Sequence, residues 1–276
     1  MSEAPSGTIT LPDGRRLAYD DVGDPDGVAV VYLHGCPDCR RTRHPDDSIA
    51  RDLGVRLVAV DRPGYGASDP PAVPTLASQA DDVVALVDAL GIEQCGVFAW
   101  SSGAMVALAL AARAPARIGA LAIAAGTLPT PGPADDASIA EIVSLLVPDP
   151  ITIELAQEAV REHKSAPYLR DLESVAGLEA RLAEAMVEAV AGGIAGAAFD
   201  VRAACTALPL DLGRIDVPVD LWYGEKDDVV PVSAGEYLAA TLPHATLHVV
   251  PDASHLVALT HWTTILESLR RDLTCR

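Results

Sequence analysis

The sequence predicts an α/β fold built on one mostly parallel β-sheet with helices on both faces. Short apolar runs rich in β-branched residues alternate with segments of helical periodicity along most of the 276 residues, as they do in βαβ units. Two of these runs, residues 28–33 and 55–60, are continuously apolar, which is typical of strands buried on both faces. Half of the residues are apolar, so the chain can bury one sizeable core. We expect one main domain that carries an insertion.

The individual elements follow from local patterns. A hairpin is expected first, because residues 8–11 and 16–21 flank the turn-forming sequence Pro-Asp-Gly. An amphipathic helix is expected over residues 76–90, where apolar side chains recur at helical spacing until Gly91. Further strands are expected at residues 96–99, 118–124, 219–223 and 246–250, and further helices at residues 102–113, 233–242 and 261–273.

The alternation of strands and helices breaks between residues 127 and 210. A linker rich in proline and glycine, residues 129–133, leads into helical periodicity without a convincing strand. We interpret residues 127–210 as a helical cap inserted into a core formed by residues 1–126 and 211–276. The apolar positions of the cap are expected to be packing residues rather than ligand contacts. They include Ile139, Ile142, Leu145, Leu146, Leu172, Leu178, Leu182 and Met186.

Composition excludes several classes of function. A formal net charge of −19 disfavours binding to a phosphate backbone, so we expect a small-molecule substrate and no nucleic-acid partner. The longest apolar stretches are shorter than the roughly 18 residues that span a bilayer, so no membrane role is expected. Residues 1–12 lack the basic start and apolar core of a signal peptide, and we expect a cytoplasmic protein. The excess of arginine over lysine is typical of high-GC bacterial coding.

The five cysteines do not indicate a disulfide framework or a metal site. Their number is odd, and no secretion signal accompanies them. Cys36 and Cys39 form a C-x-x-C sequence, but the second ligand pair that a structural zinc site requires is missing. We therefore expect a loop with incidental thiols and no metal or redox function.

Ser101 is the predicted nucleophile. It lies between an expected strand and an expected helix, and the small residues Ala99 and Gly103 relieve crowding in the strained turn that exposes such a serine. Ala99 stands where glycine is usual in this turn. Ser102 is the alternative nucleophile, but Ala104 rather than a glycine would then lie two positions further on.

A serine hydroxyl needs a base and an acid that orients the base. Asp227 lies at the carboxyl end of the strand expected at residues 219–223, where open α/β sheets gather catalytic groups; Asp228 is the alternative acid. His255 follows the final strand, which produces the chain order serine, aspartate, histidine. The oxyanion of the intermediate needs two donors, and we expect the backbone N–H groups of Cys36 and Ser102 to supply them. His34 is expected to brace the loop that carries Cys36.

Together these motifs resemble the α/β-hydrolase superfamily, in its branch of cap-bearing bacterial esterase-like hydrolases. The resemblance covers most of the chain and is carried by residues 34–37, 61–68, 99–103, 224–227 and 254–255. It implies an eight-stranded sheet, a helical cap over the active site and no cofactor. Epoxide hydrolases and haloalkane dehalogenases of this superfamily carry an aspartate at the nucleophile position, so Ser101 argues against both activities.

The expected activity is hydrolysis of a carboxylic ester or lactone of a small molecule through an acyl-enzyme. The same residues could also serve a thioesterase, an amidase, a carbon–carbon hydrolase, or an acyltransferase or cyclase, and the resemblance does not choose among them. A non-catalytic small-molecule sensor is a further alternative from a different class. It is disfavoured because active sites that have lost catalysis tend to lose a member of the triad. Here Ser101, Asp227 and His255 are all present.

Overall fold

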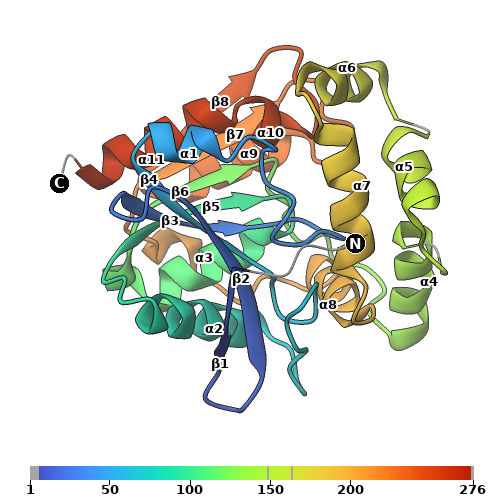
Figure 1. Ribbon diagram of the computed structural model, residues 1–276, viewed down its shortest axis with the longest axis horizontal. Coiled ribbons are helices and arrows are strands. Elements are labelled where there is room, and N and C mark those ends of the chain that lie inside the picture. The colour runs from blue at the N-terminus through green and yellow to red at the C-terminus, as the bar shows by residue number, and fades with distance from the viewer. Residues whose placement is uncertain (1–5, 148, 163, 275–276) are drawn as a thin grey trace.

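The computed structural model describes residues 6–147, 149–162 and 164–274, and an eight-stranded sheet forms its centre (Figure 1). The strands are β1 (Gly7–Thr10), β2 (Arg16–Gly23), β3 (Val28–Leu33), β4 (Val55–Val60), β5 (Cys95–Trp100), β6 (Ile118–Ala124), β7 (Val219–Gly224) and β8 (Ala245–Val250). Their order is β1-β2-β4-β3-β5-β6-β7-β8, with antiparallel pairing from β1 to β4 and parallel pairing from there on. The predicted α/β class and mostly parallel eight-stranded sheet are confirmed.

Helices cover both faces of the sheet, which is why β5 and β6 are buried at every position. The helices that lie outside the cap region are α1 (Ser48–Asp52), α2 (Leu76–Ala89), α3 (Gly103–Arg113), α9 (Val232–Thr241), α10 (Val257–Thr260) and α11 (Trp262–Thr274). Apolar residues of α2, α3 and α9 form one core cluster with the sheet, and those of α1, α10 and α11 belong to a second cluster. The described residues contain no helix both long and apolar enough to cross a membrane.

Two details differ from the expected elements. The short helix α1 was not expected, since five residues are too few to show a helical period. The helix expected at residues 261–273 begins at Trp262 instead, because His261 has non-helical backbone angles (φ −113°, ψ 22°) and ends α10. Trp262 then packs edge-on against Tyr32 of β3, with ring centroids 5.1 Å apart.

Five helices follow β6 in the chain and lie together at one end of the sheet (Figure 1). They are α4 (Asp136–Leu146), α5 (Ile153–Arg161), α6 (Ala166–Ser174), α7 (Leu178–Ala189) and α8 (Ala195–Ala204). Asp135, Thr152 and Ser165 begin the first three, because each side chain accepts a hydrogen bond from a backbone N–H in the first turn. We call this group the cap; its exact division from the core at residues 127 and 210 stays a prediction.

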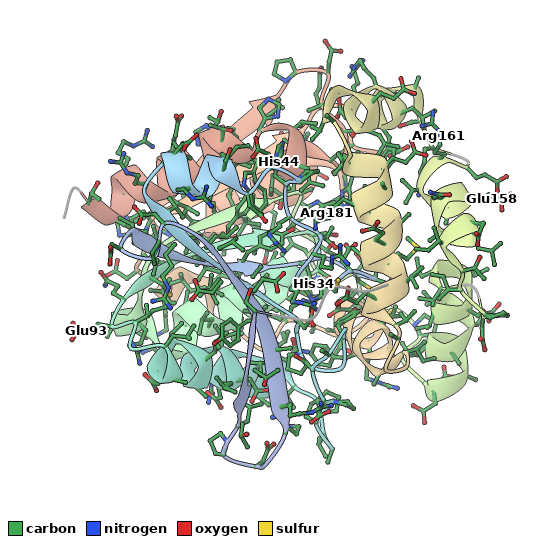
Figure 2. All side chains as sticks on the ribbon, in the orientation of Figure 1. His34, His44, Glu93, Glu158, Arg161 and Arg181 are labelled. Atoms are coloured by element: carbon green, nitrogen blue, oxygen red, sulfur yellow. The ribbon has the colours of Figure 1, made fainter. Side chains whose placement is uncertain are left out.

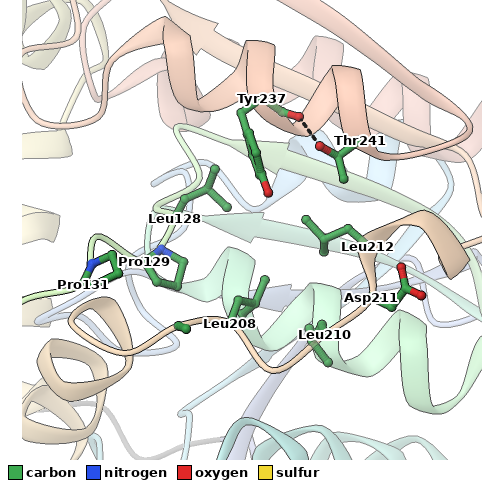
Figure 3. A pocket seen from close by; sticks show the side chains of 10 residues that line it. Leu128, Pro129, Pro131, Leu208, Leu210, Asp211, Leu212, Tyr237 and Thr241 are labelled. Carbon is green, nitrogen blue, oxygen red and sulfur yellow. Dashed lines mark hydrogen bonds between the residues drawn. The ribbon is translucent and has the colours of Figure 1, made fainter.

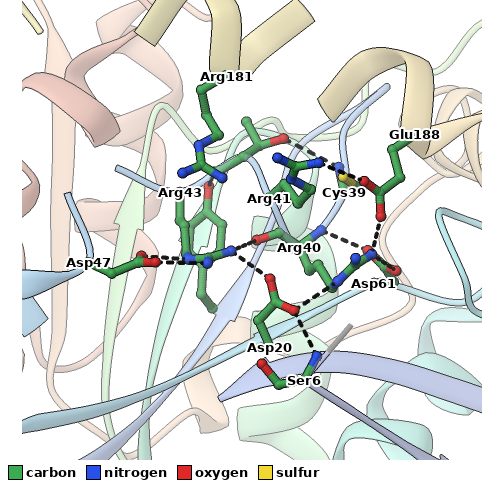
Figure 4. A network of polar contacts seen from close by, with 12 residues as sticks. Ser6, Asp20, Cys39, Arg40, Arg41, Arg43, Asp47, Asp61, Arg181 and Glu188 are labelled. Atoms are coloured by element: carbon green, nitrogen blue, oxygen red, sulfur yellow. Dashed lines mark hydrogen bonds and ion pairs between the residues drawn. The ribbon is translucent and has the colours of Figure 1, made fainter. Parts of the chain in front are cut away.

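A buried ion network fastens α7 of the cap to the core (Figure 4). Arg40, only 1% exposed, contacts Asp20 of β2 at 3.0 Å, Asp61 after β4 at 2.7 Å and Glu188 of α7 at 2.5 Å. Three carboxylates around one guanidinium compensate for its removal from water. Loss of one partner from such a cluster lowers the free energy of unfolding. The cap therefore has a fixed attachment next to the loop that follows β3.

Candidate active site

Ser101 lies in a strained turn between β5 and α3. Its φ of 53° falls in the left-handed region that non-glycine residues rarely adopt. Gly103 makes the turn possible, because a Cβ added there would lie 2.4 Å from the Leu33 carbonyl oxygen of the neighbouring strand. The turn thus presents the Ser101 hydroxyl at the carboxyl end of the sheet, as in a nucleophile elbow.

The structure brings Ser101, His255 and Asp227 into one hydrogen-bonded chain. His255 Nε2 lies 3.2 Å from Ser101 Oγ, and His255 Nδ1 lies 2.9 Å from Asp227 Oδ2. Since Asp227 accepts at Nδ1, that nitrogen carries the proton, which leaves Nε2 free to take the proton of Ser101. The indole Nε1 of Trp100 also donates to the His255 carbonyl oxygen at 3.0 Å and so holds the histidine loop against β5.

The Asp227 side chain is fully buried, and its second oxygen is occupied. Oδ1 accepts hydrogen bonds from the backbone N–H groups of Val229 and Val230 at 2.8 and 2.9 Å. These bonds fix the carboxylate so that Oδ2 faces His255. Asp228, the alternative acid, is exposed, and among the described residues it makes no contact with His255.

Arg62 sets the shape of the loop that carries Cys36. Its guanidinium, 0% exposed, donates to the His34 carbonyl oxygen at 3.0 Å and to the Gly35 carbonyl oxygen at 2.9 Å. In a trans peptide the C=O and N–H groups point in opposite directions. With Gly35 O turned toward Arg62, the N–H of Cys36 therefore points away from it.

His34 reinforces this arrangement from the interior of the molecule (Figure 2). Its Nε2 accepts from the backbone N–H of Arg62 at 3.1 Å, so the ring proton lies on Nδ1, which donates to the Gly35 carbonyl oxygen at 2.8 Å. Burial holds the pKa of His34 well below its usual value, so the ring stays neutral and keeps this tautomer. His34 thus braces the loop and does not relay a proton.

Neither expected oxyanion donor is engaged elsewhere. In the described part of the chain, the backbone N–H groups of Cys36 and Ser102 have no protein acceptor. The loop lies against the nucleophile, since a Cβ added at Gly35 would be 3.1 Å from Ser101 Cβ. Two free N–H groups beside Ser101 could donate hydrogen bonds to an oxyanion. That they form an oxyanion hole stays a prediction.

Asp200 is a site residue that sequence reasoning missed. It comes from α8 of the cap, is 2% exposed, and accepts hydrogen bonds from Ser102 Oγ at 2.8 Å and from Tyr65 at 2.7 Å. It also forms a bidentate ion pair with Arg62, whose two terminal nitrogens lie 2.8 and 2.5 Å from the two carboxylate oxygens. One cap carboxylate therefore connects the turn at Ser101–Ser102, the loop that carries Cys36 (the oxyanion loop) and the loop after β4.

A cavity of about 320 Å³ opens over Ser101 and His255 between the core and the cap. Its walls include Trp100 from the core and Tyr168 from the cap. Four apolar cap residues that are expected to be packing residues rather than ligand contacts line it as well, and whether they contact a ligand stays a prediction. They are Leu145, Leu146, Leu182 and Met186. Helical periodicity locates an apolar face but does not reveal whether that face meets a core or a cavity.

The thiols of the C-x-x-C sequence show no sign of reactivity. Burial raises the pKa of both Cys36 and Cys39, which disfavours the thiolates that redox chemistry and metal binding need. Both are free cysteines. Within residues 6–147, 149–162 and 164–274, no group of three or more histidine, cysteine or acidic side chains is placed to hold a metal ion.

A second cavity of about 520 Å³ lies away from the triad (Figure 3). It is formed where the cap joins the core, between the linker from Leu128 to Pro131, residues 207–212 and α9. Its lining is mostly apolar and contains no serine, cysteine or histidine. The cavity over Ser101, which His255 also lines, is therefore the candidate active site.

Comparisons with known proteins agree with this fold. The sequence profile described as alpha/beta hydrolase fold matches residues 28–261. The chain is 32% identical over 235 residues to a pimeloyl-[acyl-carrier protein] methyl ester esterase of Chromobacterium violaceum, covering 82% of this chain and 87% of that protein. It is 29% identical over 264 residues to a non-heme chloroperoxidase of Streptomyces lividans, covering 92% and 95%.

A solved structure shows the same likeness in three dimensions. A hydrolase from Pseudomonas aeruginosa PA01 superimposes with a TM-score of 0.75 at 27% identity, covering 95% of this chain and 97% of that one. Because the match covers nearly all of this chain, it includes residues of both the cap and the core.

Proposed function

This chain belongs to the α/β-hydrolase fold family, and we propose that this ester-hydrolysing enzyme cleaves a carboxylic ester or a lactone of a small molecule through an acyl-enzyme on Ser101. The observation that carries the proposal is the position of His255, whose two ring nitrogens lie 3.2 Å from Ser101 Oγ and 2.9 Å from Asp227 Oδ2. A relative named as a methyl ester esterase, similar over most of its length, supports an ester as the substrate bond.

The proposed reaction has two halves. Ser101 Oγ attacks the ester carbonyl while His255 Nε2 takes its proton, and the N–H groups of Cys36 and Ser102 stabilise the oxyanion that forms. The intermediate collapses as His255 returns the proton to the leaving alcohol. Water, deprotonated by His255, then attacks the acyl group, and His255 returns this proton to Ser101 Oγ as the bond between Ser101 and the acyl group breaks and the acid is released. Asp227 stabilises the imidazolium in both halves.

The proposal is tested by covalent labelling with a fluorophosphonate probe, which reacts with activated serines. We expect the wild type to be labelled and Ser101→Ala to be unlabelled, with both proteins folded by circular dichroism. Ser102→Ala tests the alternative nucleophile: its N–H remains, so labelling should persist, at a reduced rate because the hydrogen bond to Asp200 is lost. Undiminished labelling of Ser101→Ala would show that another residue is the nucleophile.

A substrate panel then distinguishes the bond that is cleaved. Chromogenic esters of increasing acyl length should be hydrolysed best when the acyl chain is short, because the cavity of about 320 Å³ is small. Matched thioesters and anilides test the thioesterase and amidase alternatives. Turnover should vanish in both Ser101→Ala and His255→Ala. A labelled enzyme that turns over none of these compounds would instead favour a small-molecule sensor.

A further inference from the structure

The cavity over Ser101 contains a carboxylate that the proposed mechanism does not use. Asp38 lies two residues after Cys36 and lines the cavity. A Cβ added at Gly35 would lie 3.1 Å from Asp38 Oδ2 and 3.7 Å from Ser101 Oγ, so both oxygens border the same small volume. Asp38 therefore faces the space in which the ester must react.

The protein provides little compensation for the negative charge of the Asp38 carboxylate. Its Oδ1 accepts a hydrogen bond from Thr42 Oγ1 at 3.1 Å, and within the described ranges it forms no ion pair. The guanidinium of Arg62 acts on Asp38 only through its field, because its donors are directed to Asp200 and to two carbonyl oxygens. Burial accordingly raises the pKa of Asp38 to about 6. The carboxylate is still mostly ionised at pH 7 to 8.

An ionised carboxylate in this position destabilises the oxyanion unless it gains a partner, although it also interacts favourably with a protonated His255. The oxyanion that forms during attack at Ser101 is negative, and like charges in a partly dry cavity repel each other strongly. A substrate that carries a positive charge would cancel this repulsion and also supply Asp38 with the ion pair it lacks.

The rest of the cavity suits a cation with an apolar body. The aromatic side chains of Trp100 and Tyr168 line it, and aromatic faces attract ammonium groups. Lys164 already illustrates this, since its Nζ lies 5.3 Å from the centroid of the Tyr168 ring. Lys164 also lines the cavity, but it is exposed to solvent, which weakens the effect of its charge on Asp38. The net charge of −19 additionally draws cations toward the molecule.

We propose that Asp38 is a specificity-determining residue that binds an ammonium group of the substrate beside the scissile ester bond. The inference rests on the proposed hydrolysis at Ser101 and names its substrate class: small esters that carry an amine or a quaternary ammonium group. Asp38 binds and orients this group and takes no part in proton transfer.

The test compares each cationic ester with its neutral carbon isostere. One pair places the charge in the alcohol half, as in choline and 3,3-dimethylbutyl esters of the same acid. A second pair places it in the acyl half. We expect kcat/KM of the wild type to favour the cationic member of at least one pair by about tenfold or more. In Asp38→Asn, which keeps the shape and the Thr42 contact, the ratio should fall to about one. Asp26→Asn, which removes an equal charge from an exposed turn, should keep the wild-type ratio.

A binding measurement decides the matter if turnover is too slow to compare. Tetramethylammonium should slow the labelling of Ser101 by a neutral fluorophosphonate in the wild type and have no effect in Asp38→Asn. A ratio near one in both pairs, an equal ratio in wild type and Asp38→Asn, or the absence of protection would overturn the role of Asp38. Loss of Ser101 labelling would instead refute the hydrolase mechanism, so the two failures are distinguishable.

Discussion

The Asp200 carboxylate of cap helix α8 accepts a hydrogen bond of 2.8 Å from the hydroxyl of Ser102, the residue next to the proposed nucleophile Ser101. The same carboxylate holds the Arg62 guanidinium, which in turn binds the Gly35 carbonyl oxygen at 2.9 Å. The N–H groups of Cys36 and Ser102 are the two expected oxyanion donors. Asp200 holds the Ser102 side chain directly, and it holds the peptide before Cys36 through Arg62. A cap that lifted away at α8 would break these contacts, so we expect α8 to stay in place during the proposed reaction.

This connection predicts that Asp200→Asn lowers both stability and catalysis. The substitution leaves the buried Arg62 charge uncompensated, and loss of one partner of a buried pair costs about 3 kcal/mol or more. Urea unfolding should show this loss. We also expect kcat to fall by about 10- to 100-fold with a smaller change in KM, because a displaced oxyanion donor acts on the transition state.

A double variant separates the two effects. Arg62→Met combined with Asp200→Leu removes both charges and should recover part of the lost stability. Recovery is incomplete, because the hydroxyls of Ser102 and Tyr65 lose their acceptor. The oxyanion loop still lacks its guanidinium donor, so kcat should remain low. Recovery of kcat together with stability would show that the pair serves folding alone.

The acid of the triad is tested by a comparison of two adjacent aspartates. Asp227→Asn removes the acceptor that fixes the His255 tautomer, and we expect kcat to fall by on the order of 10⁴-fold. Asp228→Asn, an exposed neighbour, should change kcat by less than about twofold. Steady-state kinetics with one chromogenic ester measures both. The reverse ranking would assign the acid to Asp228.

Cys36 should act through its backbone and not through its thiol. Because burial raises its pKa, the thiol is protonated at neutral pH, and N-ethylmaleimide should not inactivate the enzyme. Cys36→Ala keeps the N–H and should retain kcat within about threefold. Inactivation of the wild type by the reagent, with Cys36→Ala resistant, would instead place the thiol at the reacting atoms.

Much of the fold was predictable because its signals are local. The continuous apolar runs of β3 and β4 and the turn between β1 and β2 identify their elements without knowledge of the rest of the chain. The predicted serine, acid and histidine could be chosen because parallel strands bring their carboxyl ends to one edge, where the structure places all three.

The supporting residues could not be found in this way. Asp200 lies on a helix in which a polar residue looks like an ordinary solvated position, yet it is 2% exposed. Its partner Arg62 is 138 positions away, and no periodicity connects the two. Leu145 and Ile139 share the apolar pattern of α4, but Leu145 lines the cavity at 80% exposure while Ile139 is buried at 2%. Such differences depend on which elements the cap packs against.

Asp38 predicts a dependence of stability on pH that Asp38→Asn should abolish. Burial raises the carboxyl pKa from 3.8 to about 6 in the folded state, so between these values the folded protein binds more protons than the unfolded chain. The free energy of unfolding therefore decreases as the pH rises through this window, and above pH 6 the ionised group costs the fold about 1 to 3 kcal/mol. Asp38→Asn removes this cost. Urea unfolding should find the variant more stable than the wild type at pH 8 and close to it at pH 4. An equal difference at both pH values would show that Asp38 is not buried as a free carboxylate.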